Sequence, residues 1–498
     1  MNPSGSALSP PELIKRQRQL ERALGSVLSP DSLLFRPEQT VPFDCDGLAA
    51  FRQTPVAVAL PETEEQVRQI LRSCRDLSVP VVARGAGTGL SGGAMPCVDG
   101  IVLSLAKLNR IIEIDPVACI ARVQPGVRNL AVSEAAATHG LYYAPDPSSQ
   151  IACTIGGNVA ENSGGVHCLK YGLTIHNVLG LRGYTIDGEP VILGSAALDT
   201  PGLDLLALTI GSEGLLVVVT EVTLKLVPKP KLAQVVMASF DDVVKAGDAV
   251  AAIIAAGIIP AGLEMMDRKA TNAVEPFVQA GYDLNAEAIL LAESDGTPEE
   301  VADEIAEIER VLKAAGSIAC TVSQSESERL KFWSGRKNAF PAAGRVSPDY
   351  YCMDGTIPRK HLGQMLRAIE EMEKKYSLRC MNVFHAGDGN LHPLILFDAN
   401  QPGEWDRADQ FGADILELCV KLGGTITGEH GVGIEKINSM CVQFAPSERD
   451  AFFGVKRTFD APGLLNPGKV IPTLARCAEY GRMHVRHGAL PFADLPRF

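Results

Sequence analysis

The first part of the chain places one amphipathic segment between two apolar runs. Residues 56–60 form an unbroken apolar run that predicts a buried strand, and residues 79–83 predict a second one. Between them, Thr63 and Gln66 have the spacing of a capping box, which predicts the start of a helix. The apolar residues that follow fall on one face of that helix: Val67, Ile70, Leu71 and Cys74. This order predicts a β-α-β unit.

Further apolar patterns predict strands and helices along most of the chain. A helix and loop are predicted for residues 12–37 and a helix for 129–139. Strands are predicted at 101–105, 111–114, 120–123, 178–186, 191–193 and 215–226. After Pro228 and Pro230, strands at 235–240 and 289–293 alternate with helices at 242–257, 298–315, 358–375 and 404–422. This second region predicts a sheet with helices on one face, so the fold class is α+β.

A glycine-rich loop follows the second strand of the β-α-β unit. Residues 84–93 read Arg-Gly-Ala-Gly-Thr-Gly-Leu-Ser-Gly-Gly, and a backbone with so few side chains can close its N–H groups around a phosphate. The alternative is a flexible surface loop. The glycine spacing also matches the dinucleotide fingerprint, but Pro96 and Asp99 leave no room for the helix that this fingerprint needs. A Rossmann-type NAD site is therefore not expected.

A second segment, residues 145–172, is rich in Gly, Asn, Ser and Pro. A connection of this length with no structure of its own is uncommon in a compact domain. We therefore predict backbone wrapped around a large ligand. Together, the two loops fit a cofactor with a pyrophosphate in its middle.

The stretch from His385 to His392 reads His-Ala-Gly-Asp-Gly-Asn-Leu-His. Apolar residues at 381–384 and 393–397 predict two strands joined by a tight polar turn. Glu429-His430 lies in a similar turn between two glycines. Two histidines and a carboxylate are a common ligand set for a divalent metal. The alternative is a glycine-rich hairpin whose histidines share no role.

Composition and charge restrict the partners. The 498 residues suffice for two or three domains, and the net charge of −13 argues against nucleic acid or an anionic membrane as a direct partner. The twelve cysteines form no Cys-x-x-Cys pair, so we expect reduced thiols in the cytoplasm and no iron–sulfur cluster in this chain. The longest apolar run, 249–263, is too short to span a bilayer. An acidic substrate would need a local cation.

Several motifs together resemble one flavoprotein superfamily. Residues 84–93, residues 145–165 and Gly211-Ser-Glu-Gly214 are similar to the FAD-binding domain of the vanillyl-alcohol-oxidase/PCMH-type flavoproteins. The stretches 338–341, 350–354, 385–392 and 464–469 resemble the FAD-linked D subunits of glycolate oxidases. The likeness covers nearly the whole chain. It implies four regions: an N-terminal helical segment at 1–49, a PCMH-type FAD-binding domain at 50–228, a ferredoxin-like α+β cap domain at 229–470, and a C-terminal helical tail at 471–498.

The resemblance also implies roles for individual residues. His430 would be the catalytic base, and Arg336 would bind the substrate carboxylate, with Lys337 and Arg345 as weaker candidates. A divalent metal, Zn²⁺ first with Mn²⁺ or Fe²⁺ as alternatives, would be held by His385, His392 and Glu429. The implied FAD contacts are Arg84, Gly85, Gly87, Thr88, Gly89, Ser91, Gly92, Gly93, Pro145, Asp146, Gly157, Asn158, Asn162, Gly164, Gly165, Glu213 and Asn466.

Two positions depart from the family pattern. Val217 stands where the family has a further glycine after Gly214, and residues 182–184 read Arg-Gly-Tyr where the family has an acidic and then aliphatic residues. If the cofactor must approach the backbone at residue 217, a β-branched side chain would crowd it.

The implied activity is FAD-dependent dehydrogenation of a small 2-hydroxy acid, glycolate, with D-lactate or another D-2-hydroxy acid as the alternative. Electrons would pass to a second flavin-domain subunit and an iron–sulfur subunit, and then to quinone. We expect a cytoplasmic location, with peripheral attachment to the inner face of the plasma membrane through those partners as an option. From other classes, a metal-dependent hydrolase without flavin and a non-catalytic scaffold subunit stay open. A redox-neutral ether-lipid synthase stays open too, although the metal motif argues against it.

Overall fold

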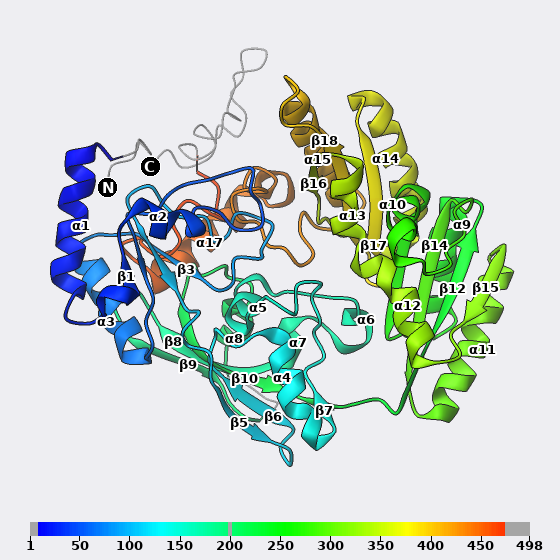
Figure 1. The fold of residues 1–498 in the computed structure, drawn as a ribbon, viewed down its shortest axis with the longest axis horizontal. Coiled ribbons are helices and arrows are strands. Elements are labelled where there is room, and N and C mark those ends of the chain that lie inside the picture. The colour runs from blue at the N-terminus through cyan, green and yellow to red at the C-terminus, as the bar shows by residue number, and fades with distance from the viewer. Residues whose placement is uncertain (1–7, 198–201, 474–498) are drawn as a thin grey trace.

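The computed structural model describes residues 8–197 and 202–473, and its chain forms two parts that lie side by side (Figure 1). The first part runs from the N-terminal helix to Pro228 and also receives α17 (Pro446–Phe459), whereas the second part lies between them in the chain. From residue 474 on, the predicted tail at 471–498 lies outside the described residues, and so do residues 1–7.

A four-stranded sheet opens the first part, with the order β1-β2-β4-β3. Its strands are β1 (Leu33–Leu34), β2 (Ala57–Ala59), β4 (Ile101–Ser104) and β3 (Val81–Arg84), and all but β1 are parallel. Helix α3 (Glu64–Asp76) starts at the predicted capping box, where Gln66 N donates to Thr63 Oγ1 at 3.2 Å, and it buries the four predicted apolar residues. The β-α-β prediction is confirmed. Helix α1 (Pro10–Leu24) packs against α3.

An antiparallel sheet of five strands follows, with the order β5-β6-β10-β8-β9. Its strands are β5 (Ile111–Asp115), β6 (Ile120–Val123), β10 (Val218–Lys225), β8 (Val178–Tyr184) and β9 (Pro190–Gly194). The short strands β7 (Leu141–Tyr142) and β11 (Val227–Pro228) pair beside it. Helix α2 (Pro37–Thr40) follows β1, and α4 (Asn129–Ala136) and α8 (Leu205–Thr209) lie between strands of the five-stranded sheet in the chain. Short 3₁₀ turns lie at Pro30–Ser32, Val41–Phe43, Ala137–His139 and, in the second part, Arg359–His361.

The segment 145–172 is not wholly the loop that its composition predicts. It contains helix α5 (Ile155–Glu161) and the single turn α6 (Cys168–Tyr171), and α7 (Thr174–Asn177) follows directly. Two glycines in α5 lower its intrinsic helix propensity, which explains the wrong prediction. The helix forms because Ile155 and Val159 are buried in the core of the five-stranded sheet. Gly156 is needed there, because a Cβ would collide with Pro125.

The second part is built on one antiparallel sheet of seven strands, ordered β15-β12-β14-β13-β17-β18-β16. These strands are β15 (Ala319–Val322), β12 (Leu232–Phe240), β14 (Ala288–Gly296), β13 (Gly262–Asp267), β17 (Arg379–His385), β18 (Asn390–Phe397) and β16 (Asp349–Cys352). The predicted hairpin of two strands around residues 385–392 is confirmed. The mixture of helices and sheets confirms the α+β class.

Helices cover both faces of this sheet, so the prediction of helices on one face is wrong. One face carries α9 (Val243–Ala255), α11 (Pro298–Ala314), α14 (Leu362–Tyr376) and α15 (Glu404–Lys421). The other face carries α10 (Arg268–Val278), α12 (Glu326–Lys337) and α13 (Ala339–Val346). In β12, Val236 and Ala238 pack in the first core, whereas Val235 and Met237 pack in the second. A strand buried on both sides reads as a continuous apolar run and does not reveal how many faces are covered.

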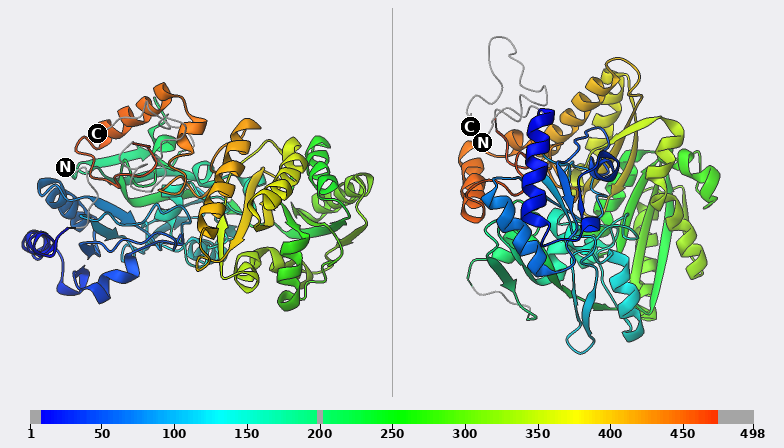
Figure 2. Two further views of the ribbon diagram at one scale, coloured as in Figure 1. Left: turned by 90° about the horizontal axis from the view of Figure 1, so that it is seen from above. Right: turned by 60° about the vertical axis from the view of Figure 1, so that its left-hand side comes forward.

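After α16 (Met440–Gln443), the chain returns to the first part, as the turned views in Figure 2 show for α17. Leu465 forms a parallel bridge with Val81 at the edge of the first sheet, and Asn466 N donates to Val81 O at 2.8 Å. Lys456 Nζ donates to Leu215 O at 2.7 Å. The two parts are therefore joined by two crossings of the chain. None of the helices in the described ranges is long and apolar enough to cross a membrane.

Candidate functional site

The hairpin β17–β18 brings the two predicted metal-binding histidines together. His385 is the last residue of β17 and His392 is the third residue of β18, and both side chains are buried. Their rings lie 5.0 Å apart in a T-shaped arrangement. Glu429 completes the group, because its Oε1 lies 2.9 Å from His392 Nε2 and 3.2 Å from His385 Nε2. Three residues from two distant segments thus converge on one point.

The other nitrogen of each ring is occupied by the protein. His385 Nδ1 lies 2.7 Å from Glu264 Oε1, and His392 Nδ1 lies 3.4 Å from the carbonyl of Met353. Such partners fix the tautomer that leaves Nε2 free to bind a metal. Burial opposes a charge on His385, yet Glu264 and Glu429 raise the pKa of His385 well above its usual range. The centre is therefore arranged for positive charge, and a divalent cation fits this donor set.

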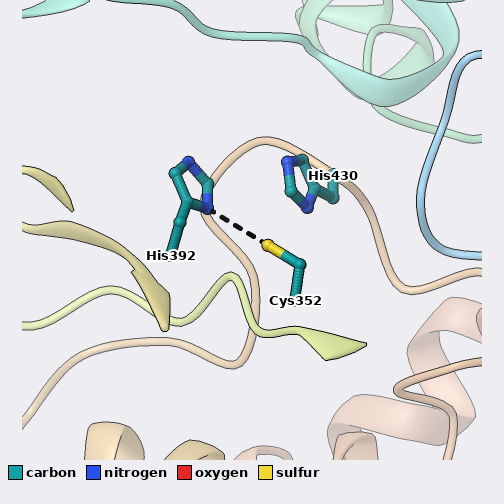
Figure 3. A group of neighbouring side chains, drawn as sticks. All are labelled: Cys352, His392 and His430. Carbon is teal, nitrogen blue, oxygen red and sulfur yellow. Dashed lines mark hydrogen bonds between the residues drawn. The ribbon is translucent and has the colours of Figure 1, made fainter. Parts of the chain in front are cut away.

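A second group of side chains that could bind a metal consists of Cys352, His392 and His430 (Figure 3). Cys352 Sγ lies 4.0 Å from His392 Nδ1, the nitrogen that points away from Glu429. Burial raises the pKa of the Cys352 thiol well above its usual value, and Sγ donates to the carbonyl of Met353 at 3.3 Å. A neutral thiol on the wrong side of the ring does not extend the group formed with Glu429.

His430 stacks on His392, with ring centroids 4.9 Å apart and an angle of 11° between the planes. Its Nδ1 is buried and has no hydrogen-bond partner among the described residues. Burial is the main cause that lowers the pKa of His430 to about 4. His430 is therefore a neutral base at physiological pH, with a ring nitrogen that can accept a proton.

Asp354 holds the turn that carries Glu429 and His430, a role that sequence reasoning missed. Its buried carboxylate accepts hydrogen bonds from His430 N at 2.9 Å, Gly428 N at 3.1 Å and Thr427 Oγ1 at 2.6 Å. Asp354 belongs to the 350–354 motif, which was singled out without a role. In the sequence, the feature that could have pointed to this role is an acidic residue directly after the apolar run 350–353.

Arg336 lies beside this cluster but is already paired. Its Nε donates to Glu264 Oε2 at 2.6 Å, and its Nη2 is 3.5 Å from the His385 ring. Only 1% of the side chain is exposed. Sequence reasoning also missed Glu264, which bridges Arg336 and His385; the signal available was an acidic residue placed between the apolar residues Leu263 and Met265 of β13. Asp388 serves the turn, since its Oδ1 accepts from Asn390 N at 3.0 Å.

A cavity of about 380 Å³ runs between the two parts and reaches this cluster. Its wall includes His392, Glu429 and His430 together with residues of the glycine-rich loop. The predicted FAD contacts that line it are Arg84, Gly85, Gly87, Thr88, Gly89, Gly93, Gly157, Asn158 and Glu213. Val217 lines it too, as a buried wall residue packed with Leu216 and Ile471. The valine at position 217, where the family has a glycine, therefore does not close the cavity.

The other predicted contacts lie behind the cavity wall. Asn466 Nδ2 donates to Gly93 O at 3.0 Å and to Glu213 O at 2.6 Å, so it braces two wall segments. Asp146 Oδ2 lies 2.7 Å from His167 Nδ1 and does not face the cavity. The remaining residues support neighbouring loops or line a smaller cavity behind Glu429: Ser91, Gly92, Pro145 and Asn162 in the first group, Gly164 and Gly165 in the second.

The cavity wall suits a large polar cofactor. Buried oxygen or nitrogen atoms without a partner among the described residues include Thr154 Oγ1, Glu161 Oε2 and His430 Nδ1. All three residues line the cavity. Unpaired buried polar atoms are rare and point to a ligand that completes them. A cofactor with phosphates at the glycine-rich end and a reactive ring near His430 fits these residues.

Comparisons with known proteins agree with this interpretation. Residues 55–194 match the model of an FAD binding domain, and residues 229–470 match that of FAD linked oxidases, C-terminal domain. The chain is 61% identical over 466 residues to glycolate oxidase subunit GlcD of Escherichia coli strain K12, covering 94% of this chain and 93% of the relative. Identity is 39% to the subunit of the same name in Bacillus subtilis, covering 87% and 93%. It is 32% to a D-lactate dehydrogenase of Archaeoglobus fulgidus, covering 89% and 97%.

Solved structures share the fold at low identity. The structure of p-cresol methylhydroxylase with substrate bound has a TM-score of 0.75 at 18% identity, with 93% of this chain and 97% of the other covered. An alkyldihydroxyacetonephosphate synthase has a TM-score of 0.72 at 17% identity, covering 93% and 86%. These likenesses concern the arrangement of the two parts and not their chemistry.

Proposed function

Because the chain belongs to the family of FAD-linked oxidases that includes the glycolate oxidase D subunits, we propose that it oxidises glycolate to the 2-oxo acid. One observation carries the proposal. His430, a neutral base with an unpaired buried nitrogen, stands beside His385, His392 and Glu429 at the end of the cavity that suits FAD. D-lactate, the substrate named for relatives near 30% identity, is the competing substrate.

The residues divide the chemistry between them. His430 would accept the hydroxyl proton of the substrate at Nδ1. Glu264 and Arg336 would orient His385, and Asp354 would hold His430 in place. Bound FAD would supply the acceptor for the hydride that leaves Cα of the substrate. A divalent ion, Zn²⁺ first with Mn²⁺ or Fe²⁺ as alternatives, would be held by His385, His392 and Glu429, and would acidify the hydroxyl.

Electrons must leave the reduced flavin through other proteins. The chain has twelve cysteines without a Cys-x-x-Cys pair, so it lacks the usual ligand pattern of an iron–sulfur cluster. The relatives are named as subunits, which supports a multi-subunit complex. As its other members we propose a second flavin-domain subunit and an iron–sulfur subunit. We place this complex in the cytoplasm, with attachment to the inner face of the plasma membrane through those partners, and quinone as the final acceptor.

The test is anaerobic bleaching of the bound flavin. The purified protein is loaded with FAD and mixed with glycolate or D-lactate. The absorbance at ~450 nm, which any oxidised flavin shows, is then followed in time. Glycolate should bleach the flavin faster than D-lactate does. His430→Gln should slow bleaching by roughly 10²- to 10⁴-fold while the flavin stays bound, because only the general base is lost. His139→Gln, which changes an exposed histidine of the first part, is the matched control.

The other outcomes identify the rival functions. A protein that binds no flavin but hydrolyses esters or amides in a metal-dependent way would be the hydrolase. Bound flavin that no 2-hydroxy acid can bleach would indicate the scaffold subunit or a redox-neutral enzyme. Faster bleaching by D-lactate would keep the mechanism and change the substrate.

A further inference from the structure

Glu161 is a carboxyl group in the cavity wall that the mechanism above does not use. It is the last residue of α5 and lines the cavity together with His430. Its Oε2 is fully buried and has no hydrogen-bond partner among the described residues. A buried oxygen of this kind costs free energy unless it is protonated or paired with a ligand.

Glu161 Oε2 lies close to the loop that carries His430. A Cβ added to Gly431, the residue after His430, would collide with Glu161 Oε2, and a Cβ on Gly93 would lie 2.7 Å from Oε1. A cofactor ring that takes a hydride from a substrate beside His430 must come close to Glu161.

Glu213 is the neighbouring carboxyl group, and its hydrogen bonds indicate which of the two acids, Glu161 or Glu213, carries the negative charge. Glu213 Oε1 accepts from Val432 N at 2.6 Å, and Oε2 accepts from Gly433 N at 2.7 Å, so both oxygens act as acceptors. This pattern fits a carboxylate. Burial, followed by the charges of Glu213 and Asp46, raises the pKa of Glu161 well above its usual range. The nearby cations are committed: Lys436 Nζ binds Glu435, and Lys469 Nζ donates to Gly93 O, Met95 O and Asn466 Oδ1.

We infer that Glu161 is a neutral carboxylic acid that donates a hydrogen bond to the flavin ring and raises the reduction potential of the bound FAD. A reduced flavin carries more electron density on its ring than an oxidised one. A donor aimed at the ring therefore stabilises the reduced form more. The inference rests on FAD binding, as the proposed function does, but not on the identity of the substrate.

The test measures the potential of the bound flavin by equilibration with redox dyes, without any 2-hydroxy acid. Glu161→Gln keeps a neutral donor of similar shape, so its potential should match that of the wild type. Glu161→Leu removes the donor and should shift the equilibrium about tenfold toward oxidised flavin, which is ~30 mV lower for a two-electron couple. Glu134→Gln, an exposed change on α4, is the matched control and should leave the potential unchanged.

The sign of the change separates the possible roles. If Glu161 were an anion, both Glu161 variants would raise the potential, because each removes a negative charge from the neighbourhood of the ring. If Glu161 only filled space, neither would move it. Either result overturns the inference, and if Glu161→Leu fails to bind FAD, the sign for Glu161→Gln still separates a neutral acid from an anion. Since substrate is absent, failure here leaves the glycolate bleaching test untouched.

Discussion

Replacement of Asp354 by asparagine tests how the Glu429–His430 turn is held. The carboxylate is fully buried and accepts from three consecutive backbone N–H groups, those of residues 428–430. It also accepts from Thr427 Oγ1 at 2.6 Å and, through Oδ1, from Asn390 Nδ2 at 3.0 Å. An asparagine would turn one acceptor into a donor that faces N–H groups, and the negative charge 3.8 Å from Lys436 Nζ would be lost.

The structure gives the size of the effect. Burial alone would raise the pKa of Asp354, but His430, Lys436 and His392 outweigh it and bring the pKa from its ordinary 3.8 to about 2. At about 1.36 kcal/mol per unit, this difference stabilises the folded protein by roughly 2–3 kcal/mol. Hydrogen bonds left unmade add to this, so we expect D354N to lower the free energy of unfolding by about 3–5 kcal/mol.

The dependence on pH follows from the direction of the shift. The folded pKa lies below the unfolded one, so the stabilisation is complete above pH ~4 and is lost as pH falls through about 2. The difference between wild type and D354N should therefore shrink in acid. Catalysis should fall too, since a displacement of His430 by about 1 Å costs on the order of 10²-fold in rate.

Thermal and denaturant unfolding at one fixed FAD concentration measure the stability, and anaerobic bleaching measures the rate. Asp349→Asn is the matched control, because Asp349 lies at the partly exposed start of β16, the strand that precedes Asp354, and its Oδ2 accepts from Ala399 N at 2.9 Å. It should cost less than about 1 kcal/mol. If D354N unfolds like the control and bleaches at the wild-type rate, Asp354 does not hold the turn.

Three further predictions concern the substrate, the metal and the contact between the two parts. Lys337 lines the cavity and forms no ion pair among the described residues, whereas Arg336 is paired with Glu264. Lys337→Met should therefore raise KM for glycolate roughly 10- to 100-fold, and the exposed Lys331→Met should not. Complete removal of divalent metal by a chelator should slow flavin bleaching by at least ~10²-fold without loss of flavin absorbance, and metal replacement should restore it; an unchanged rate after verified removal would exclude the metal. His167 lies 2.7 Å from Asp146 and 3.1 Å from Glu293, so His167→Gln should lower the unfolding midpoint by about 2–4 °C, and an unchanged midpoint would show that this contact does not stabilise the protein.

Local patterns predicted those parts of the molecule whose cause is local. The capping box at Thr63, the buried face of α3 and the hairpin at 385–392 depend on residues a few positions apart, and the structure has all three. The prediction of a loop was wrong for α5. Gly156 and Gly157 favour a loop on their own, and the segment becomes helical because Ile155 and Val159 pack against a sheet. Propensity describes the segment alone, whereas the core decides the outcome.

The supporting residues of the site could not be predicted in this way. Glu264 is 121 residues from His385 and 72 residues from Arg336, and its neighbours within β13, Leu263 and Met265, are apolar. Nothing within a few residues marks such a side chain as a partner of a histidine. An acidic residue between apolar residues of a buried strand is therefore a position where a site of this kind can extend beyond its motifs.

The Glu429–His430 turn is fastened from both parts of the protein. On the side of the seven-stranded sheet, Asp354 accepts from the N–H groups of residues 428–430. On the side of the first part, Glu213 accepts from Val432 N and Gly433 N. Two carboxylates, one from each part, thus accept hydrogen bonds from neighbouring backbone segments of one loop, residues 428–430 and residues 432–433. The position of His430 relative to the first part therefore depends on the way the two parts pack together, and a change at these two contacts should also move this base.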